Sequence, residues 1–315
     1  MKNIPLNTLD ELRPPNSNFI HFENWQSNPF KHDAVGFELV NAWWLAEAAL
    51  LAYGDGAFVR QRFEITGLNA AGFSVQCFDH EGTQCFVAHN DSFVIVSFRG
   101  TDIFEFREAV MDLITDAKLF PLPDWAGGLV HHGFNEALSG VWEDIRAYVN
   151  KLRSDIPTRT LWFTGHSLGA ALATLAADRF IRDENSAVAG LYTFGSPRVG
   201  DSSFKRRLAE EGIEQRTFLF VNNNDAVTRV PLRPLYVHVG SLMYIDEAGH
   251  IKSMDEDSLI KSDLGVSHLS KSLMEGFHTA AHLGNITNDV PDSLADHAPI
   301  YYAVHIWNNY ERQLG

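Results

Sequence analysis

Cysteine is scarce in this chain of 315 residues, which has only Cys77 and Cys85. Two cysteines cannot build the disulfide framework that stabilises small secreted domains, so the fold must depend on a buried core. The segment between them has the composition of a hairpin turn, where a disulfide between neighbouring strands is conceivable. We instead expect two free thiols, because the chain shows no sign of an oxidising compartment.

Long apolar runs and an apolar leader are also lacking. No stretch reaches the roughly 18 consecutive apolar residues of a membrane-spanning helix, so none is predicted. The first ten residues are too polar for a secretory signal. On this basis we predict a cytoplasmic protein.

Basic residues are few relative to acidic ones. The chain has 25 Lys and Arg against 40 Asp and Glu, for a formal net charge of −15. This balance makes nucleic acid an unexpected partner and disfavours electrostatic docking on anionic lipid. Hydrophobic residues make up 45% of the chain, which is enough for one large domain with a buried core. We therefore expect residues 1–315 to form a single α/β domain.

Strand-like and helix-like segments alternate along most of the chain. The expected strands are 93–98, 160–164, 191–194, 217–221, 236–239 and 243–245, the expected helices are 41–53, 131–152 and 170–177, and a hairpin is expected over 72–89. Such alternation predicts a mostly parallel sheet with helices on both faces. Residues 1–30 are expected to form an arm over the domain, and 253–295 a polar, helix-prone excursion from it.

The pentapeptide Gly165-His166-Ser167-Leu168-Gly169 lies between a strand-like and a helix-like segment. A serine at such a junction sits in a tight turn that lifts its hydroxyl clear of the backbone, and the flanking glycines avoid clashes. The N–H groups that follow open a helix and point at any negative charge beside the serine. The pattern alone is weak evidence, but its context predicts a nucleophile elbow with half of an oxyanion hole.

Candidate partners for Ser167 come from strand ends, because chemistry collects at the carboxyl ends of strands in such sheets. Asp225 follows the strand 217–221 and lies downstream of the serine, in the Ser, Asp, His order of α/β-hydrolases. The alternative is an ordinary turn-forming aspartate. The strand 93–98 ends at Gly100, so the N–H of Thr101 is the candidate second oxyanion donor beside that of Leu168.

The histidine is harder to choose, because seven follow the serine. They are His238, His250, His268, His278, His282, His297 and His305. We select His297, because it follows a loop, precedes the last expected helix and has Pro299 near the helix start. We expect His238 to be a core residue, because it lies within the apolar segment 236–239. His278 and His282 are four residues apart, but no Glu completes a His-Glu-x-x-His pattern, so no metal site is expected.

With these residues identified, the chain resembles the class 3 lipases, which are fungal-lipase-like α/β-hydrolases. The resemblance covers residues 41–302. Besides the elbow, four segments carry it: Phe98-Arg99-Gly100-Thr101, Val130-His131-His132-Gly133-Phe134, Thr193-Phe194-Gly195-Ser196-Pro197-Arg198-Val199-Gly200-Asp201, and Asp296-His297 with Tyr301. The resemblance implies an α/β-hydrolase fold, with Ser167 as nucleophile, Asp225 as acid, His297 as base, and Thr101 and Leu168 as oxyanion donors. It also implies a lid over residues 102–116.

The expected activity is that of a serine carboxylester hydrolase, a triacylglycerol lipase that forms an acyl-enzyme on Ser167. Its partners would be a lipid or other ester and, transiently, a lipid–water interface, and no metal or organic cofactor is expected. The alternatives are an esterase for short soluble esters, a phospholipase A1, an acyltransferase, and an inactive binding protein on the same fold.

Overall fold

The computed structural model of the chain describes residues 1–80, 82–101, 121–123, 127–231, 233–262, 290 and 292–315. Within these residues one sheet has the strand order β1-β2-β3-β6-β7-β8-β9-β10. The strands are β1 (Ser74–His80), β2 (Thr83–His89), β3 (Phe93–Phe98), β6 (Thr160–His166), β7 (Gly190–Phe194), β8 (Thr217–Asn222), β9 (Ser241–Ile245) and β10 (Ile251–Met254). Strands β3, β6, β7, β8 and β9 run parallel, and β1, β2 and β10 are antiparallel additions at the edges. The mostly parallel sheet predicted from the sequence is therefore confirmed.

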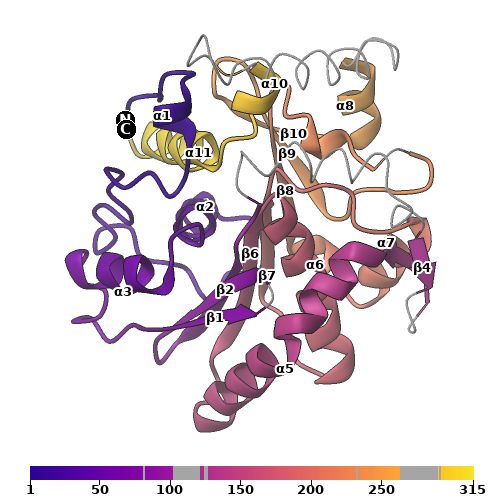
Figure 1. Cartoon of the computed structure of the whole chain (residues 1–315), viewed down its shortest axis with the longest axis horizontal. Coiled ribbons are helices and arrows are strands. Elements are labelled where there is room, and N and C mark those ends of the chain that lie inside the picture. Colours follow the sequence, from indigo (N-terminus) through magenta and orange to yellow (C-terminus); the bar gives the residue numbers. More distant parts are fainter. Residues whose placement is uncertain (81, 102–120, 124–126, 232, 263–289, 291) are drawn as a thin grey trace.

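Helices cover both faces of this sheet. They are α1 (Leu9–Leu12), α2 (Leu39–Leu51), α3 (Gly56–Ile65), α5 (His132–Asp155), α6 (Leu168–Asp183), α7 (Ser202–Glu210), α8 (Glu256–Ser262), α10 (Asp292–Ala295) and α11 (Pro299–Leu314), with short 3₁₀ turns at Glu214–Arg216 and Val227–Arg229 and a small two-stranded sheet of β4 (Pro121–Pro123) and β5 (Leu129–His131). Figure 1 shows α2 and α11 on one side of the sheet and α5 and α6 on the other.

The apolar run of β3 follows from this double cover. Phe93 and Ile95 belong to the core beneath α2 and α11. Val94 and Val96 belong to the core beneath α5 and α6. Since successive side chains of a strand point to opposite faces, a strand covered on both sides is apolar on both faces, and the one polar side chain of β3, Ser97, donates its hydroxyl to the Ala48 carbonyl of α2.

The hairpin expected over 72–89 is present as β1 and β2, and it explains why both cysteines are free. Cys77 lies opposite Phe86, and Cys85 lies opposite Phe78. Residues directly opposite each other share a face, so the two sulfurs lie on opposite faces of the hairpin. The prediction of free thiols is confirmed, although Cys77 is only half-buried.

The expected strand 236–239 is wrong. In this segment Val237 forms only an isolated bridge with Gly200. The reason is that β8 already pairs with β7 on one side and with β9 on the other, which leaves no free edge beside it. His238 is buried there, and its Nε2 lies 2.8 Å from the Thr228 carbonyl, as expected for a core histidine.

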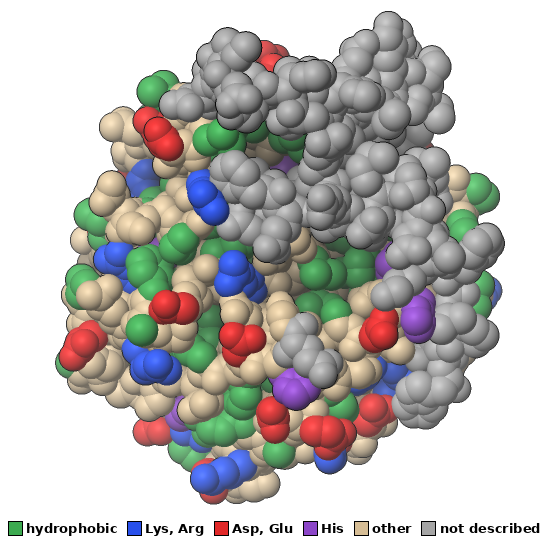
Figure 2. Space-filling model, viewed as in Figure 1, with side chains coloured by type: hydrophobic (Ala, Val, Ile, Leu, Met, Phe, Trp, Pro, Cys, Tyr) green, Lys and Arg blue, Asp and Glu red, His purple; other side chains and the backbone are tan. Residues whose placement is uncertain are grey.

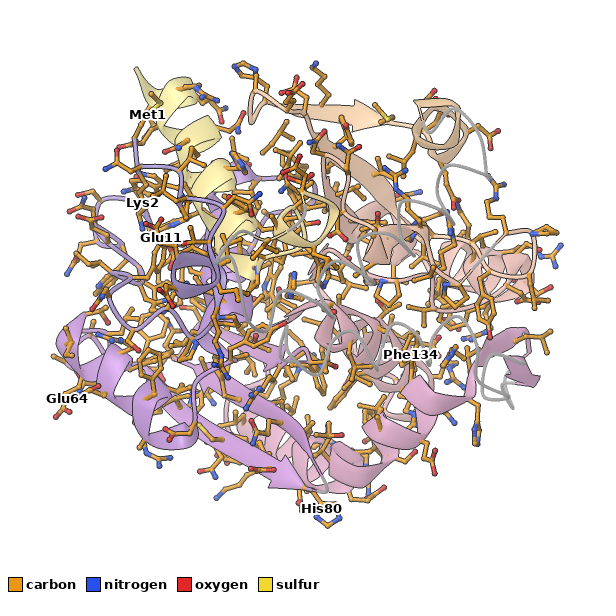
Figure 3. The ribbon with its side chains drawn as sticks, turned by 45° about the horizontal axis from the view of Figure 1, so that its top comes forward. Met1, Lys2, Glu11, Glu64, His80 and Phe134 are labelled. Carbon is orange, nitrogen blue, oxygen red and sulfur yellow. The ribbon has the colours of Figure 1, made fainter. Side chains whose placement is uncertain are left out.

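Residues 1–30 lie along α2 and α11 and are anchored by a buried charge. The carboxylate of Glu47 on α2 is 3.3 Å from Lys2 Nζ and 3.2 Å from His21 Nδ1. Figure 3 shows Met1, Lys2 and Glu11 together on this arm, far from His80 at the hairpin end. Of the segment 253–295, the described parts are the end of β10, α8, Val290 and α10. The candidate lid, 102–116, lies outside the described residues.

The described surface is mixed in character. On the face shown in Figure 2, acidic and basic side chains are interspersed, and apolar side chains gather near the centre. No helix in the described ranges is both long and apolar enough to cross a membrane.

Candidate active site

Ser167 occupies the tight turn between β6 and α6. Its backbone has φ 58° and ψ −128°, a conformation that residues with a Cβ rarely adopt. The Ser167 N–H donates to the Phe194 carbonyl of β7 at 3.0 Å, which holds the turn against the sheet. Backbone strain at a junction of two regular elements is typical of a functional turn.

Two glycines allow three backbone segments to meet at this turn. A Cβ on Gly165 would lie 2.3 Å from the carbonyl oxygen of Gly169, and a Cβ on Gly169 would lie 2.3 Å from the carbonyl oxygen of Phe98. No side chain fits at either distance. The glycines are therefore steric requirements of the turn, and the second contact brings the end of β3 against the start of α6.

Asp225 follows β8 and His297 precedes α11, and the fold brings their side chains together. Nδ1 of His297 lies 2.8 Å from Oδ2 and 3.0 Å from Oδ1 of Asp225. Both side chains are buried. Because an ionised carboxylate only accepts hydrogen bonds, Nδ1 of His297 carries the hydrogen. In the neutral ring Nε2 then holds the lone pair, which is the tautomer that a general base requires.

The residue before Ser167 holds His297 beside the turn. Nε2 of His166 lies 2.7 Å from the His297 carbonyl oxygen, and the centroids of the two rings are 4.4 Å apart. A carbonyl only accepts, so His166 donates from Nε2, and its Nδ1 accepts from the Tyr53 hydroxyl at 2.7 Å. Burial, aided by the neighbouring His297, lowers the pKa of His166 well below its ordinary value, so the ring is neutral. Ser167 and Asp225 thus lie beyond the carboxyl ends of β6 and β8, and His297 lies beside them.

Tyr302 completes the surroundings of Asp225, and sequence reasoning did not find it. Its hydroxyl donates to Oδ2 of Asp225 at 2.5 Å, and the Val227 N–H donates to Oδ1 at 2.9 Å. Burial and the carboxylate of Asp225 raise the pKa of Tyr302 well above its ordinary value, so it stays a donor. The neighbouring Tyr301, which the family resemblance selected, instead donates to the Pro5 carbonyl of the arm at 3.2 Å.

Leu168 directly follows Ser167, and Thr101 follows a segment that packs against the turn. Phe98 pairs with Gly165 in parallel register, and a Cβ on Gly100 would lie 2.6 Å from the His166 carbonyl oxygen. Thr101 therefore follows a backbone that is pressed against the turn. Leu168 is the first residue of α6, where N–H groups have no partner within the helix.

The remaining candidate histidines do not join this site in the described part of the chain. His250 lies 3.6 Å from Asp246 in an exposed turn, and His305 is on α11. His268, His278 and His282 lie outside the described residues. Among the residues that are described, no three His, Cys, Asp or Glu side chains gather closely enough to hold a metal ion.

Comparisons with known proteins find lipases among the proteins to which this chain is similar. Residues 95–234 match the family model described as lipase (class 3). A lipase of Rhizomucor miehei is 31% identical over 209 residues, which cover 64% of this chain and 54% of that protein. A secreted mono- and diacylglycerol lipase of Penicillium cyclopium is 34% identical over 160 residues, 50% of each protein. The match thus spans about half the length of these relatives.

A solved structure shares the fold. It is a triacylglycerol lipase whose catalytic centre is described as a serine protease triad. It has a TM-score of 0.57 and 25% identity to this chain, and the match covers 69% of this chain and 83% of that one. The α/β-hydrolase fold implied by the sequence is confirmed.

The names of the relatives contradict the predicted cytoplasmic location. The relatives from Penicillium cyclopium and Fusarium solani are named as secreted lipases, which points to an extracellular rather than a cytoplasmic protein. The prediction is wrong because it depended on the absence of a recognisable leader, and that absence does not decide the compartment.

Proposed function

Because the chain belongs to the class 3 lipase family, we propose that it is a serine carboxylester hydrolase that cleaves acylglycerol esters. The observation that carries this proposal is the Asp225–His297 pair, which His166 holds beside the strained Ser167 turn. The names of the relatives, a lipase and a mono- and diacylglycerol lipase, support acylglycerols as the substrate class.

The proposed reaction begins with proton transfer from the Ser167 hydroxyl to Nε2 of His297 as the oxygen attacks the ester carbonyl. Asp225 holds the ring in the required tautomer and stabilises the imidazolium that forms. His297 then gives its proton to the departing alcohol. Water, activated in the same way, releases the fatty acid from Ser167.

The negative charge on the tetrahedral intermediate needs donors that are in place before the reaction. We assign this role to the backbone N–H groups of Thr101 and Leu168. The close contacts of Gly100 and Gly169 support the assignment, because they fix both backbones beside Ser167. Fixed dipoles of this kind act strongly in a site that excludes water.

The substrate class is tested with a panel of esters of rising chain length. We expect hydrolysis of glycerol tributyrate and of longer acylglycerols, with a rate that rises sharply once the substrate exceeds its solubility and forms an emulsion. Fatty-acid release is followed by titration at constant pH. The control is the Ser167→Ala protein, which should show only the background rate on every substrate.

Other outcomes of the panel would replace this proposal. Activity confined to dissolved short-chain esters would identify an esterase, and release of fatty acid from the first position of phosphatidylcholine alone would identify a phospholipase A1. Ester formation with an added alcohol in place of hydrolysis would identify an acyltransferase. A folded protein that neither hydrolyses esters nor reacts with a fluorophosphonate would be a binding protein.

A further inference from the structure

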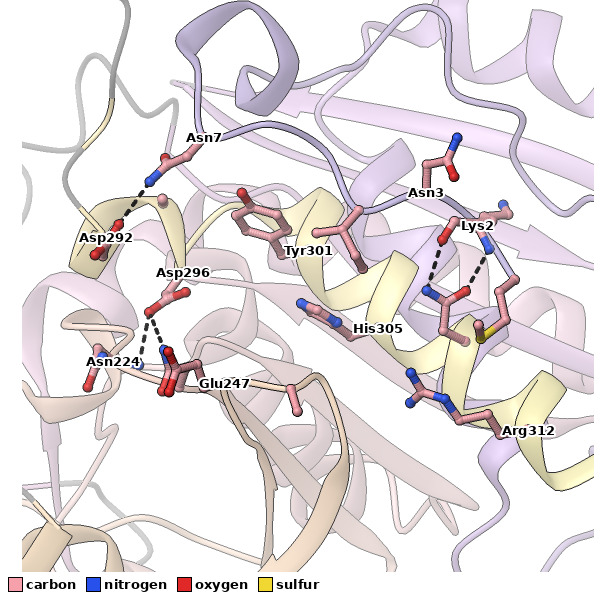
Figure 4. Close-up of a pocket in the computed structure, with 16 residues that line it drawn as sticks. Lys2, Asn3, Asn7, Asn224, Glu247, Asp292, Asp296, Tyr301, His305 and Arg312 are labelled. Atoms are coloured by element: carbon pink, nitrogen blue, oxygen red, sulfur yellow. Dashed lines mark hydrogen bonds between the residues drawn. The ribbon is translucent and has the colours of Figure 1, made fainter.

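A carboxylate beside the acid–base pair has no part in the mechanism above. Asp296 lies between α10 and α11 and immediately precedes His297. Its half-buried side chain lines a polar cavity of about 840 Å³ between the arm, the loop after β8 and α11. Figure 4 shows this carboxylate turned toward Asn224, with Lys2 and Arg312 on the far side of the cavity.

Asp296 ties together the two loops that carry the pair. Its Oδ2 accepts from the Asn223 side-chain amide at 3.1 Å and from the Asn224 backbone N–H at 3.1 Å. Its backbone carbonyl accepts from the Asn222 side-chain amide at 2.9 Å. Asn222, Asn223 and Asn224 are the three residues that lead directly to Asp225. All three hydrogen bonds therefore connect the approach to the acid with the residue that precedes the base.

We propose that Asp296 is a positioning residue that holds the Asp225 loop against the His297 loop, so that acid and base keep their contact. The inference depends on the proposed function of that pair. Asn223 has a φ of 39°, in the left-handed region, which Asn tolerates better than most residues with a side chain, and this turn presents its side-chain amide to Asp296. Asp296 is fixed in turn, since its N–H donates to the Asp292 carbonyl at 2.7 Å.

The carboxyl group that makes this restraint is partly buried and lies among other charged and titratable groups. Asp225 faces Asp296 from the β8 loop and Asp292 faces it from α10. The other charged or titratable groups around it are Tyr301, Tyr302, His305 and Arg312 of α11, Glu247 of the β9–β10 turn and Lys2 of the arm. Burial raises the pKa of Asp296 to about 7, and the charges of Asp225 and Asp292 add to the rise. Protonation removes the charge that strengthens both hydrogen bonds to the Asn223–Asn224 turn.

The consequence for stability has a definite sign. A carboxyl group whose pKa is higher in the folded protein than in the unfolded chain favours folding at low pH, and this contribution is lost as the pH rises through about 7. Ionised Asp296 thus destabilises the fold at alkaline pH while holding the site together. A carboxylate that served only stability would instead have a lowered pKa and would stabilise the folded protein when ionised.

The first test is the Asp296→Asn variant, which keeps the shape and removes the charge. At pH 8 we expect kcat on a dissolved short-chain ester to fall by about 10-fold to 100-fold, because small misplacements of catalytic groups cost rates of this order. KM should change by less than about twofold, since the substrate contacts are intact. Below pH 7, a plot of log kcat/KM against pH should have a slope greater than 1 for the wild type, because more than one proton is involved. The same plot for the variant should have a slope of 1.

The second measurement is thermal unfolding of the same variant. We expect its melting temperature to exceed that of the wild type at pH 8, and the difference to shrink as the pH falls and to vanish only below the pKa of an unfolded Asp, about 4. The matched control is Glu247→Gln, which removes a charge from the same cavity at an exposed position and should leave kcat and the slope of the pH profile unchanged. Asn223→Gly, which tolerates the positive φ and deletes one donor, should lower kcat in the same direction as Asp296→Asn.

The outcomes separate this inference from the proposed function. An active wild type with an Asp296→Asn variant of equal kcat and the same acid slope would overturn the role of Asp296 alone. A variant with a lower melting temperature at pH 8 would make Asp296 an ordinary structural residue. If Asp296→Asn fails to fold, unchanged activity in Asn223→Gly would overturn the inference. A wild type without ester hydrolysis would overturn both proposals.

Discussion

Replacing Ser167 with alanine is expected to lower kcat for ester hydrolysis by about 10⁶-fold, because removal of the nucleophile of a triad costs a factor of this order. The same substitution should abolish covalent labelling by a fluorophosphonate, which needs the activated hydroxyl. Residual activity should come only from the oxyanion donors and from substrate binding. The rate is measured on a dissolved ester, so that access to an interface does not limit it.

Control substitutions separate chemistry from folding. Ser139→Ala on α5 removes a hydroxyl that donates to the Asn135 carbonyl at the surface, and it should leave the rate unchanged. Ser167→Gly should be as inactive as Ser167→Ala but should unfold at a higher temperature, because glycine adopts a φ of 58° without strain. Full activity in either Ser167 variant would remove this residue from the mechanism.

The sequence alone predicted the parts of the site that are local. The Ser167 turn is a property of five consecutive residues between a strand and a helix, and the close approach of Gly165 and Gly169 gives the reason for both glycines. Asp225 could be proposed from its place after a buried strand. The fold class followed from the alternation of strand-like and helix-like segments. The apolar residues of β3 on both faces are typical of a parallel strand that is covered on both sides.

Contacts that depend on the packing of distant segments were not predictable. Tyr301 and Tyr302 are consecutive on α11, and only the orientation of the helix decides that the second faces Asp225 while the first faces the arm. The chain from Tyr53 through His166 to the His297 carbonyl joins three segments that are far apart in sequence. The composition of a sequence carries no signal for such a contact.

The segment 236–239 shows the converse error. Its residues have the composition of a strand, yet β8 is occupied on both edges, so tertiary context overrides local preference. The choice of His297 among seven histidines needed more than its position before a helix. The observation that supports this choice is the pair of short contacts to Asp225, which no local pattern contains.

Replacing Asp225 with asparagine is expected to lower kcat by about 10⁴-fold with little change in KM, as for the equivalent change in other triads. The amide would donate to Nδ1 of His297, where the carboxylate now accepts. Nε2 would then carry the hydrogen, and the ring could no longer take the proton of Ser167. Activity is measured at pH 8 on a dissolved ester, with circular dichroism to confirm the fold.

Tyr302→Phe gives the matched comparison for that loss. It removes the hydroxyl that donates to Asp225 Oδ2 but leaves the carboxylate and its contact with His297. Loss of one hydrogen bond to a charged group corresponds to about 1.5–3 kcal/mol, so we expect kcat to fall by about 10-fold to 150-fold. Equal losses in Asp225→Asn and Tyr302→Phe would show that the tautomer of His297 is not what Asp225 controls. Both variants remove the hydrogen bond from the Tyr302 hydroxyl to an ionised carboxylate, but only Asp225→Asn also changes the partner of His297 Nδ1. A much larger loss of kcat in Asp225→Asn than in Tyr302→Phe would therefore assign the difference to the tautomer of His297.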